Sequence, residues 1–253
     1  MTNSQAVILI HGLFGTTPMT AMGEDLKNNG FKPHYFDYKT NFLKPPYFKD
    51  LSELAEKLLS FIDHLDTEES KLSFVCHSMG GLILLKALEL RPNLKINRVV
   101  FHGTPFEGSP IADYLHHPDQ MDLKGFKPNK KFIEGLKYIN HWFVGSVGEE
   151  LSVIYRKANP LKISDQINAA AIVTGDRAGL KYAWSKPLMD FIGTGKNDGL
   201  VPFSSACAGI VDQNTPILSL PTNHDGTLRR WIIGKNPGIA QTRHFLNHNC
   251  FDL

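Results

Sequence analysis

The chain has 253 residues, of which 42% are hydrophobic and 21% are charged, so it can bury a core and is neither a disordered tail nor a small disulfide-held scaffold. The chain has 27 basic and 25 acidic residues, so its charge is nearly balanced. No strong positive potential over the surface favours a nucleic-acid partner. The longest apolar runs, 6–10 and 169–173, are far shorter than the roughly 20 residues needed to cross a bilayer.

The start of the chain lacks the pattern of a secretion signal. Such signals combine a basic start with an apolar stretch of about 7–15 residues. Here the apolar run that begins at Ala6 already ends at His11. The cysteines, Cys76, Cys207 and Cys250, are too few and too scattered for a disulfide framework. We therefore expect a cytoplasmic protein.

Short β-rich runs alternate with longer helical patterns along the chain. This alternation predicts an α/β protein with a mostly parallel sheet and helices on both faces. Several of the runs are apolar throughout, as expected for strands covered on both faces. The predicted strands are, in chain order, 6–10, 31–38, 72–76, 98–102, 169–174 and 216–220.

Three helices are predicted from capping and periodicity. Thr17-Pro18 provides a start signal and Gly30 a stop, which predicts a helix of about twelve residues. Asp50 and Glu53 resemble a capping box in front of an amphipathic helix. Residues 82–90 are apolar nearly all round, so this helix is expected to lie buried against the centre of the sheet.

Strand-like patterns vanish between residues 107 and 165, a stretch too long for a plain connection. Phe132, Leu136, Ile139 and Phe143 follow a helical spacing within it. We expect one domain, 1–253, with 107–165 inserted as a helical cap over the carboxyl ends of the strands, where ligands bind in such sheets. The alternative is an excursion that only adds packing.

The strongest chemical signal is His77-Ser78-Met79-Gly80-Gly81, which joins an apolar strand to an apolar helix. A serine on this sharp turn presents its hydroxyl at the sheet edge, and the turn accepts only small residues two positions to either side. Gly80 and Cys76 meet that requirement. A serine that only caps the helix is the simpler alternative.

A nucleophilic serine needs a base and an acid that orients the base, and in such sheets they follow in the order serine, acid, histidine. Two acids are candidates: Asp198 in a glycine-flanked loop, and Asp176 directly after a predicted strand. His224 is favoured as the base because it follows the last strand on a loop, where a mobile imidazole can lie over Ser78. The histidines at strand ends are expected to be fixed by backbone packing; they are His11, His77 and His102.

An oxyanion that forms during attack needs hydrogen-bond donors. Met79 offers its backbone N–H at the start of a helix, where the helix dipole also helps. The second donor is expected from the loop after the first strand, with Leu13 favoured and Phe14 as the alternative.

Taken together, four separated motifs closed by His224 resemble the α/β-hydrolases, and within them the bacterial serine lipases and carboxylesterases; the motifs lie in 11–15, 77–81, 103–109 and 197–202. The resemblance implies that Ser78 is the nucleophile, Asp198 the acid and His224 the base. It also implies an oxyanion hole formed by the N–H groups of Leu13 and Met79. It favours Asp198 over the rival acid.

The expected function is cleavage of carboxyl esters of acyl chains through an acyl-enzyme. An acyl-protein thioesterase or acyltransferase, and a non-catalytic ligand-binding module, are the alternatives on the same fold. The substrate would be a small-molecule or lipid acyl ester, contacted by Phe14, His77, Phe132 and Phe143.

No cofactor or metal is expected. His244 and His248 have a metal-ligand spacing but no nearby glutamate, and a solvated helix face explains them more simply. Five lysines against one glutamate in 124–137 give the predicted cap a basic edge. Transient contact with an anionic membrane surface is therefore an option, although a solvated helix face is the simpler interpretation.

Overall fold

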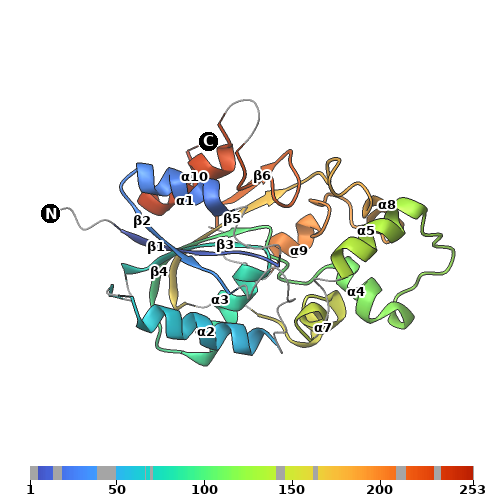
Figure 1. Ribbon diagram of the computed structural model, residues 1–253, viewed down its shortest axis with the longest axis horizontal. Coiled ribbons are helices and arrows are strands. Elements are labelled where there is room, and N and C mark those ends of the chain that lie inside the picture. The colour runs from blue at the N-terminus through green and yellow to red at the C-terminus, as the bar shows by residue number, and fades with distance from the viewer. Residues whose placement is uncertain are drawn as a thin grey trace.

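The protein is built around one parallel six-stranded sheet with the strand order β2-β1-β3-β4-β5-β6 (Figure 1). The computed structural model describes residues 5–13, 19–38, 50–65, 67–68, 71–140, 146–161, 165–208, 215–230 and 235–252, apart from the side chains at 138–140. The strands are β1 (Ala6–Ile10), β2 (Lys32–Phe36), β3 (Ser73–His77), β4 (Ile96–His102), β5 (Ile167–Gly175) and β6 (Ile217–Leu220). All six predicted strands and their parallel arrangement are confirmed.

Helices cover both faces of the sheet, α1 and α10 on one and α2 and α3 on the other (Figure 1). The side chains of β1 alternate accordingly: Ile8 and Ile10 share a core with α2 and α3, whereas Val7 and Leu9 share one with α1 and α10. No helix in the described ranges is long and apolar enough to span a membrane. The helices outside the insertion are α1 (Met19–Asn28), α2 (Leu51–Asp63), α3 (Met79–Leu90), α8 (Lys186–Phe191), α9 (Phe203–Cys207) and α10 (Pro237–His248).

The predicted caps and strand ends are only partly matched. The Asp50 side chain accepts a hydrogen bond of 2.9 Å from the Glu53 backbone N–H, so the predicted cap of α2 is confirmed. Helix α1 is ten residues long, and the expected start signal at 17–18 lies outside the described residues. Strand β2 is shorter than the predicted 31–38 because β1 offers only five residues for pairing and its last, Ile10, lies opposite Phe36.

The long segment between β4 and β5 is helical. Phe132 is 0% exposed and Leu136 7% exposed, so these two members of the predicted stripe face the core. The Ile139 side chain and Phe143 lie outside the described part of the structure. Whether the segment acts as a cap stays a prediction. Its elements are α4 (Pro110–His116), the 3₁₀ turn η2 (Pro118–Gln120), α5 (Lys130–Asn140), α6 (Ser146–Glu150) and α7 (Val153–Ala158).

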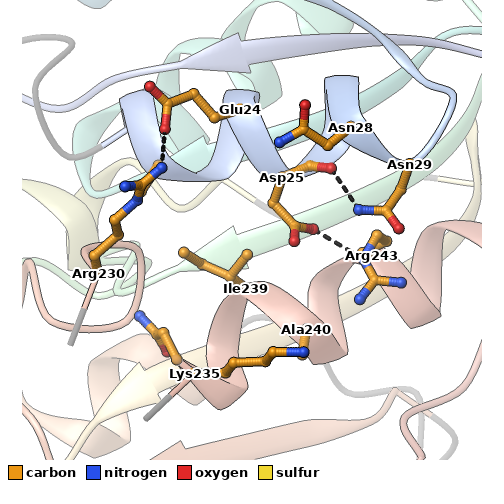
Figure 2. Close-up of a pocket in the computed structure, with 11 residues that line it drawn as sticks. Glu24, Asp25, Asn28, Asn29, Arg230, Lys235, Ile239, Ala240 and Arg243 are labelled. Carbon is orange, nitrogen blue, oxygen red and sulfur yellow. Dashed lines mark hydrogen bonds and ion pairs between the residues drawn. The ribbon is translucent and has the colours of Figure 1, made fainter. Parts of the chain in front are cut away.

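A pocket of about 410 Å³ lies between α1 and α10 (Figure 2). Its charged groups are largely paired with one another: Arg230 contacts Glu24, and Arg243 lies 2.8 Å from Asp25. None of the proposed catalytic residues lines it. This pocket is therefore not our candidate for the active site.

Gly80 controls how closely the first turn of α3 approaches the end of β1. A Cβ at this position would lie 2.5 Å from the carbonyl oxygen of Ile10 and 2.8 Å from that of His11. Both are backbone atoms near the centre of the sheet, which cannot move aside without disturbing strand pairing. The approach therefore requires glycine.

We predict that Gly80→Ala lowers the free energy of unfolding by about 1–3 kcal/mol, the usual cost of overpacking a tight site. The matched control is Gly23→Ala in α1, where the nearest atom belongs to the Tyr35 hydroxyl at the end of a side chain that is 39% exposed and can rotate away. Urea unfolding of both variants measures the difference. Equal losses would contradict the steric argument.

Candidate active site

Ser78 lies on a strained turn between β3 and α3. Its backbone has φ 54° and ψ −128°, and Asn249 is the one other non-glycine residue with positive φ in the described ranges. Such a conformation costs energy and occurs where surrounding contacts enforce it. The Ser78 backbone N–H donates a hydrogen bond of 2.8 Å to the carbonyl of His102, the last residue of β4. The turn has the geometry expected of a nucleophile elbow.

The loop after β1 lies directly against Ser78. A Cβ on Gly12 would be only 2.7 Å from the Ser78 Cβ, so the backbone of this loop can approach the serine only because residue 12 is glycine. Leu13 follows in the same loop and is 8% exposed. Met79 begins α3 on the other side of the serine. The two expected oxyanion donors thus come from segments next to Ser78, whereas the alternative, Phe14, lies outside the described residues.

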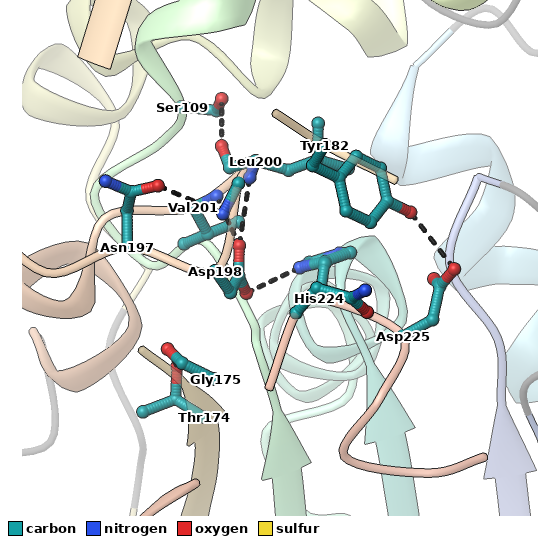
Figure 3. Close-up of polar contacts among 12 residues, drawn as sticks. Ser109, Thr174, Gly175, Tyr182, Asn197, Asp198, Leu200, Val201, His224 and Asp225 are labelled. Atoms are coloured by element: carbon teal, nitrogen blue, oxygen red, sulfur yellow. Dashed lines mark hydrogen bonds and ion pairs between the residues drawn. The ribbon is translucent and has the colours of Figure 1, made fainter. Parts of the chain in front are cut away.

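His224 and Asp198 form a buried pair (Figure 3). His224 Nδ1 lies 2.7 Å from Asp198 Oδ2, and the side chains are 1% and 0% exposed. The second carboxylate oxygen accepts hydrogen bonds from the backbone N–H groups of Leu200, at 3.0 Å, and Val201, at 2.8 Å. Both oxygens of the buried carboxylate are therefore satisfied, as a charge in this position requires.

The rival acid has different surroundings. Asp176 is 19% exposed, and its Oδ2 lies 3.5 Å from the Ser219 hydroxyl and 3.9 Å from Lys196 Nζ. His224 is paired with Asp198 and not with Asp176.

The free side of the His224 ring is suited to accept a proton. Nε2 is buried and has no hydrogen-bond partner among the described residues. Burial lowers the pKa of this histidine, but the Asp198 carboxylate and its hydrogen bond, together with the charge of Asp225, raise it, and the pKa lies above its usual value. Because Asp198 accepts the Nδ1–H, the neutral ring leaves Nε2 as the acceptor.

His77 packs against His224 and is hydrogen-bonded to its backbone. Its Nε2 lies 3.0 Å from the backbone carbonyl of His224 and donates to it, and the two ring centroids are 4.9 Å apart. Burial, followed by the proximity of His224, lowers the pKa of His77 to about 4, so this ring is neutral near pH 7. Sequence reasoning assigned His77 to substrate contact; the structure places it 1% exposed, against the loop that carries the candidate base.

The other histidines at strand ends are held in contacts of their own. The His11 ring stacks on Tyr38 with centroids 3.9 Å apart, and its Nδ1 lies 2.6 Å from the Gly12 carbonyl. His102 Nε2 lies 2.9 Å from the Thr242 hydroxyl on α10. His224 differs from the mobile imidazole that the sequence suggested, because it is 1% exposed and its backbone N–H donates to the Asp198 carbonyl at 3.0 Å.

Sequence reasoning gave no role to Asp225, which forms a second buried carboxylate beside the site (Figure 3). Asp225 is 1% exposed and accepts from the Tyr182 hydroxyl at 3.0 Å, while Lys181 and Arg229 form ion pairs with it. The Tyr182 ring stands edge-on to His224 at 6.4 Å. The position of Asp225 directly after His224 was the available signal; no pattern indicated that residues 181–182 would meet it.

The aromatic residues predicted to contact substrate are only partly described. Phe132 is 0% exposed and packs against Tyr114 at 5.1 Å, Phe126 at 5.4 Å and Trp184 at 6.3 Å between ring centroids. Phe14 and Phe143 lie outside the described residues. A contact between Phe132 and substrate therefore stays a prediction.

The described ranges contain no cluster of three or more His, Cys, Asp or Glu side chains with the arrangement of a metal site. The His244 and His248 rings lie 4.5 Å apart on α10.

A family comparison matches residues 2–104 to the family described as "Putative serine esterase (DUF676)". The matched part contains the loop after β1 and the Ser78 turn, but ends before Asp198 and His224. No curated protein matches this sequence.

Solved structures of hydrolases resemble the whole chain at low identity. Lipase BlEst2 from Bacillus licheniformis is 17% identical, with 89% of this chain and 86% of that chain covered and a TM-score of 0.57. Mouse alpha/beta hydrolase domain-containing protein 10 is 16% identical, with 98% and 89% covered and a TM-score of 0.56. Phospholipase PlaB from Legionella pneumophila is 13% identical, with 97% and 60% covered and a TM-score of 0.63. With its parallel sheet, helices on both faces and serine turn after β3, this chain has the α/β-hydrolase fold.

Proposed function

We propose that the protein is a serine hydrolase that cleaves carboxyl esters of acyl chains. The observation that carries the proposal is the buried His224–Asp198 pair at the same sheet edge as the strained Ser78 turn. The match to a family described as serine esterases over 2–104, and the likeness in fold to lipases and esterases, support it.

In the proposed reaction, the Ser78 hydroxyl attacks the ester carbonyl while His224 Nε2 accepts its proton. The imidazolium then donates this proton to the departing alcohol, which leaves an acyl group on Ser78. In the second half, His224 removes a proton from water as the water attacks the acyl carbonyl, and the free acid departs. Asp198 holds the Nδ1–H and stabilises the positive ring at each stage.

The negative charge on the carbonyl oxygen would be stabilised by the backbone N–H groups of Leu13 and Met79. Met79 is the first residue of α3, where the helix dipole is favourable to an anion. Removing an oxyanion donor that is a side chain typically raises the barrier by about 2.7–4 kcal/mol. Because both donors belong to the backbone, side-chain substitution does not remove them.

We predict that a fluorophosphonate labels Ser78 stoichiometrically, because attack on phosphorus uses the same activated hydroxyl as attack on an ester. Intact-mass spectrometry should show one adduct on the parent protein and on Ser219→Ala, an exposed serine of β6, and none on Ser78→Ala. Folded parent protein that stays unlabelled would contradict catalysis and favour a ligand-binding module.

We predict that Asp198→Asn lowers kcat by up to about 10⁴-fold, because the amide N–H₂ can no longer accept the Nδ1–H and the wrong tautomer is favoured. The pKa of His224 should also fall, since the carboxylate that raises it is lost. The base must be neutral, so the acid limb of the profile of kcat/KM against pH should move to lower pH.

Asp176→Asn is the matched control for this prediction, because it changes the rival acid in the same way. It should leave both kcat and the pH profile close to those of the parent protein. Circular dichroism checks that both variants are folded. If Asp176→Asn produced the larger loss, the acid would be misassigned.

The ester specificity is tested separately from the catalytic residues. We predict that an oxygen ester is hydrolysed to free acid, with the acid and alcohol released in equal amounts as the two half-reactions require. A matched thioester with the same acyl group, and an added alcohol as acceptor, serve as comparisons under chromatography. Faster turnover of the thioester, or an acylated alcohol as the main product, would contradict an ester hydrolase.

A further inference from the structure

Leu180 is the most exposed large apolar side chain in the described ranges, with 99% of its surface open to solvent. It lies in the connection between β5 and α8, next to Gly179, whose φ is +58°. A single exposed leucine is common on protein surfaces. Leu180 differs from such isolated leucines in the residues around it and in its position beside the candidate site.

Other exposed apolar side chains lie on the elements beside it. Ile133 on α5 is 36% exposed and Phe191 on α8 is 41% exposed. These elements are packed together: the Trp184 ring lies directly over Gly135 of α5, and Phe191 lies 5.2 Å from Phe126 between ring centroids. In Figure 1, α5 and α8 both lie at the end of the molecule that also carries α4 and α7. We call Ile133, Leu180 and Phe191 the apolar patch.

The Leu180 end of the patch borders the candidate active site. The next residue, Lys181, forms an ion pair with Asp225, which directly follows His224. Tyr182 then packs its ring edge-on to His224 with centroids 6.4 Å apart. A surface that binds through Leu180 would therefore lie next to the segment that packs against His224.

The surroundings of the patch are basic. Residues 124–137 carry exposed lysines at 124, 127, 130, 131 and 137 against one glutamate, Glu134. Arg177, three residues before Leu180, is 72% exposed and lies 3.6 Å from the Asp176 carboxylate. The acidic residue of α8, Asp190, is paired with Lys186. Exposed apolar side chains with exposed cations in the same segments suit a surface with an apolar interior and anionic head groups.

We propose that this face docks on an anionic lipid surface, with Leu180 entering the acyl-chain region and the surrounding lysines and Arg177 contacting the head groups. Burial of the leucine side chain among the acyl chains contributes binding free energy. The attraction between the cations and anionic head groups makes binding specific for anionic membranes. Docking does not depend on hydrolysis. Its consequence, that acyl esters enter the site from the membrane, rests on the proposed function.

Flotation with lipid vesicles tests the apolar contribution. The background is Ser78→Ala, so that the lipids stay intact whatever the activity, and the vesicles contain equal parts of phosphatidylglycerol and phosphatidylcholine. Leu180→Ser should weaken binding by about tenfold, as loss of a buried leucine side chain implies. The matched control is Leu90→Ser on α3, where the leucine is 44% exposed but lies outside the patch, and binding should be unchanged.

Charge reversal tests the choice of lipid. Arg177→Glu combined with Lys131→Glu should reduce binding by at least about tenfold, and added salt should reduce the binding of the parent protein. The matched control combines Lys71→Glu with Lys95→Glu, two exposed lysines outside 124–137. Vesicles of phosphatidylcholine alone should bind weakly.

Several results would overturn the proposal. They are an absence of binding to anionic vesicles, binding of Leu180→Ser equal to that of the parent, and equal binding to neutral vesicles. Self-association that Leu180→Ser abolishes, without vesicle binding, would assign the patch to a second copy of the chain. With Ser78 intact, Leu180→Ser should hydrolyse a soluble short-chain ester at the parent rate. Failure of the parent in that assay would count against the proposed function and not against docking.

Discussion

The buried carboxylate of Asp198 is the feature on which the rest of the site depends. An ionised group that is 0% exposed is costly unless its oxygens are fully hydrogen-bonded. Here two backbone N–H groups and one imidazole N–H satisfy it. The same bonds fix the position of the His224 ring, because the histidine contributes the third donor. The same contacts therefore stabilise the buried Asp198 carboxylate and orient the ring of the candidate base, His224.

Three further contacts hold His224 from other directions. Its backbone N–H donates to the Asp198 carbonyl, its own carbonyl accepts from His77, and Tyr182 packs on the ring edge. Tyr182 is itself tied to Asp225 through its hydroxyl. A general base must lie within about half an ångström of its working position, and rigid support of this kind meets that demand better than a mobile loop would. The burial of His224 is consistent with such support.

The features that could be predicted from the sequence are those that depend on residues close together in the chain. The turn around Ser78, the small residues on either side of it and the alternation of strands and helices are local patterns, so the fold and the serine turn could be predicted. Local pattern left Asp176, directly after a predicted strand, as a rival to Asp198 in its glycine-flanked loop, because aspartates in both settings also form ordinary turns. The resemblance to known hydrolases also favoured Asp198, and the pairing with His224 depends on how distant loops meet.

Contacts between distant segments account for what was missed. His77 was expected to be fixed by packing at its strand end and to contact substrate, but no local pattern indicated that its ring meets the His224 loop, 147 residues away in the chain. Likewise, Lys181 and Tyr182 meet Asp225 across more than 40 residues, and nothing in the composition of either segment indicates the contact. Only the three-dimensional order of β3, β5 and β6 brings these residues together.

The helical segment between β4 and β5 is hydrogen-bonded to the loops around Asp198. The Ser109 hydroxyl, just before α4, donates to the Leu200 carbonyl at 2.6 Å, and the Ser205 hydroxyl donates to the Gly108 carbonyl at 2.7 Å. Leu200 also donates its N–H to Asp198. The start of this helical segment is therefore attached to the loop whose backbone holds the Asp198 carboxylate. A displacement of residues 108–109 would therefore disturb the hydrogen-bonded loop that holds Asp198.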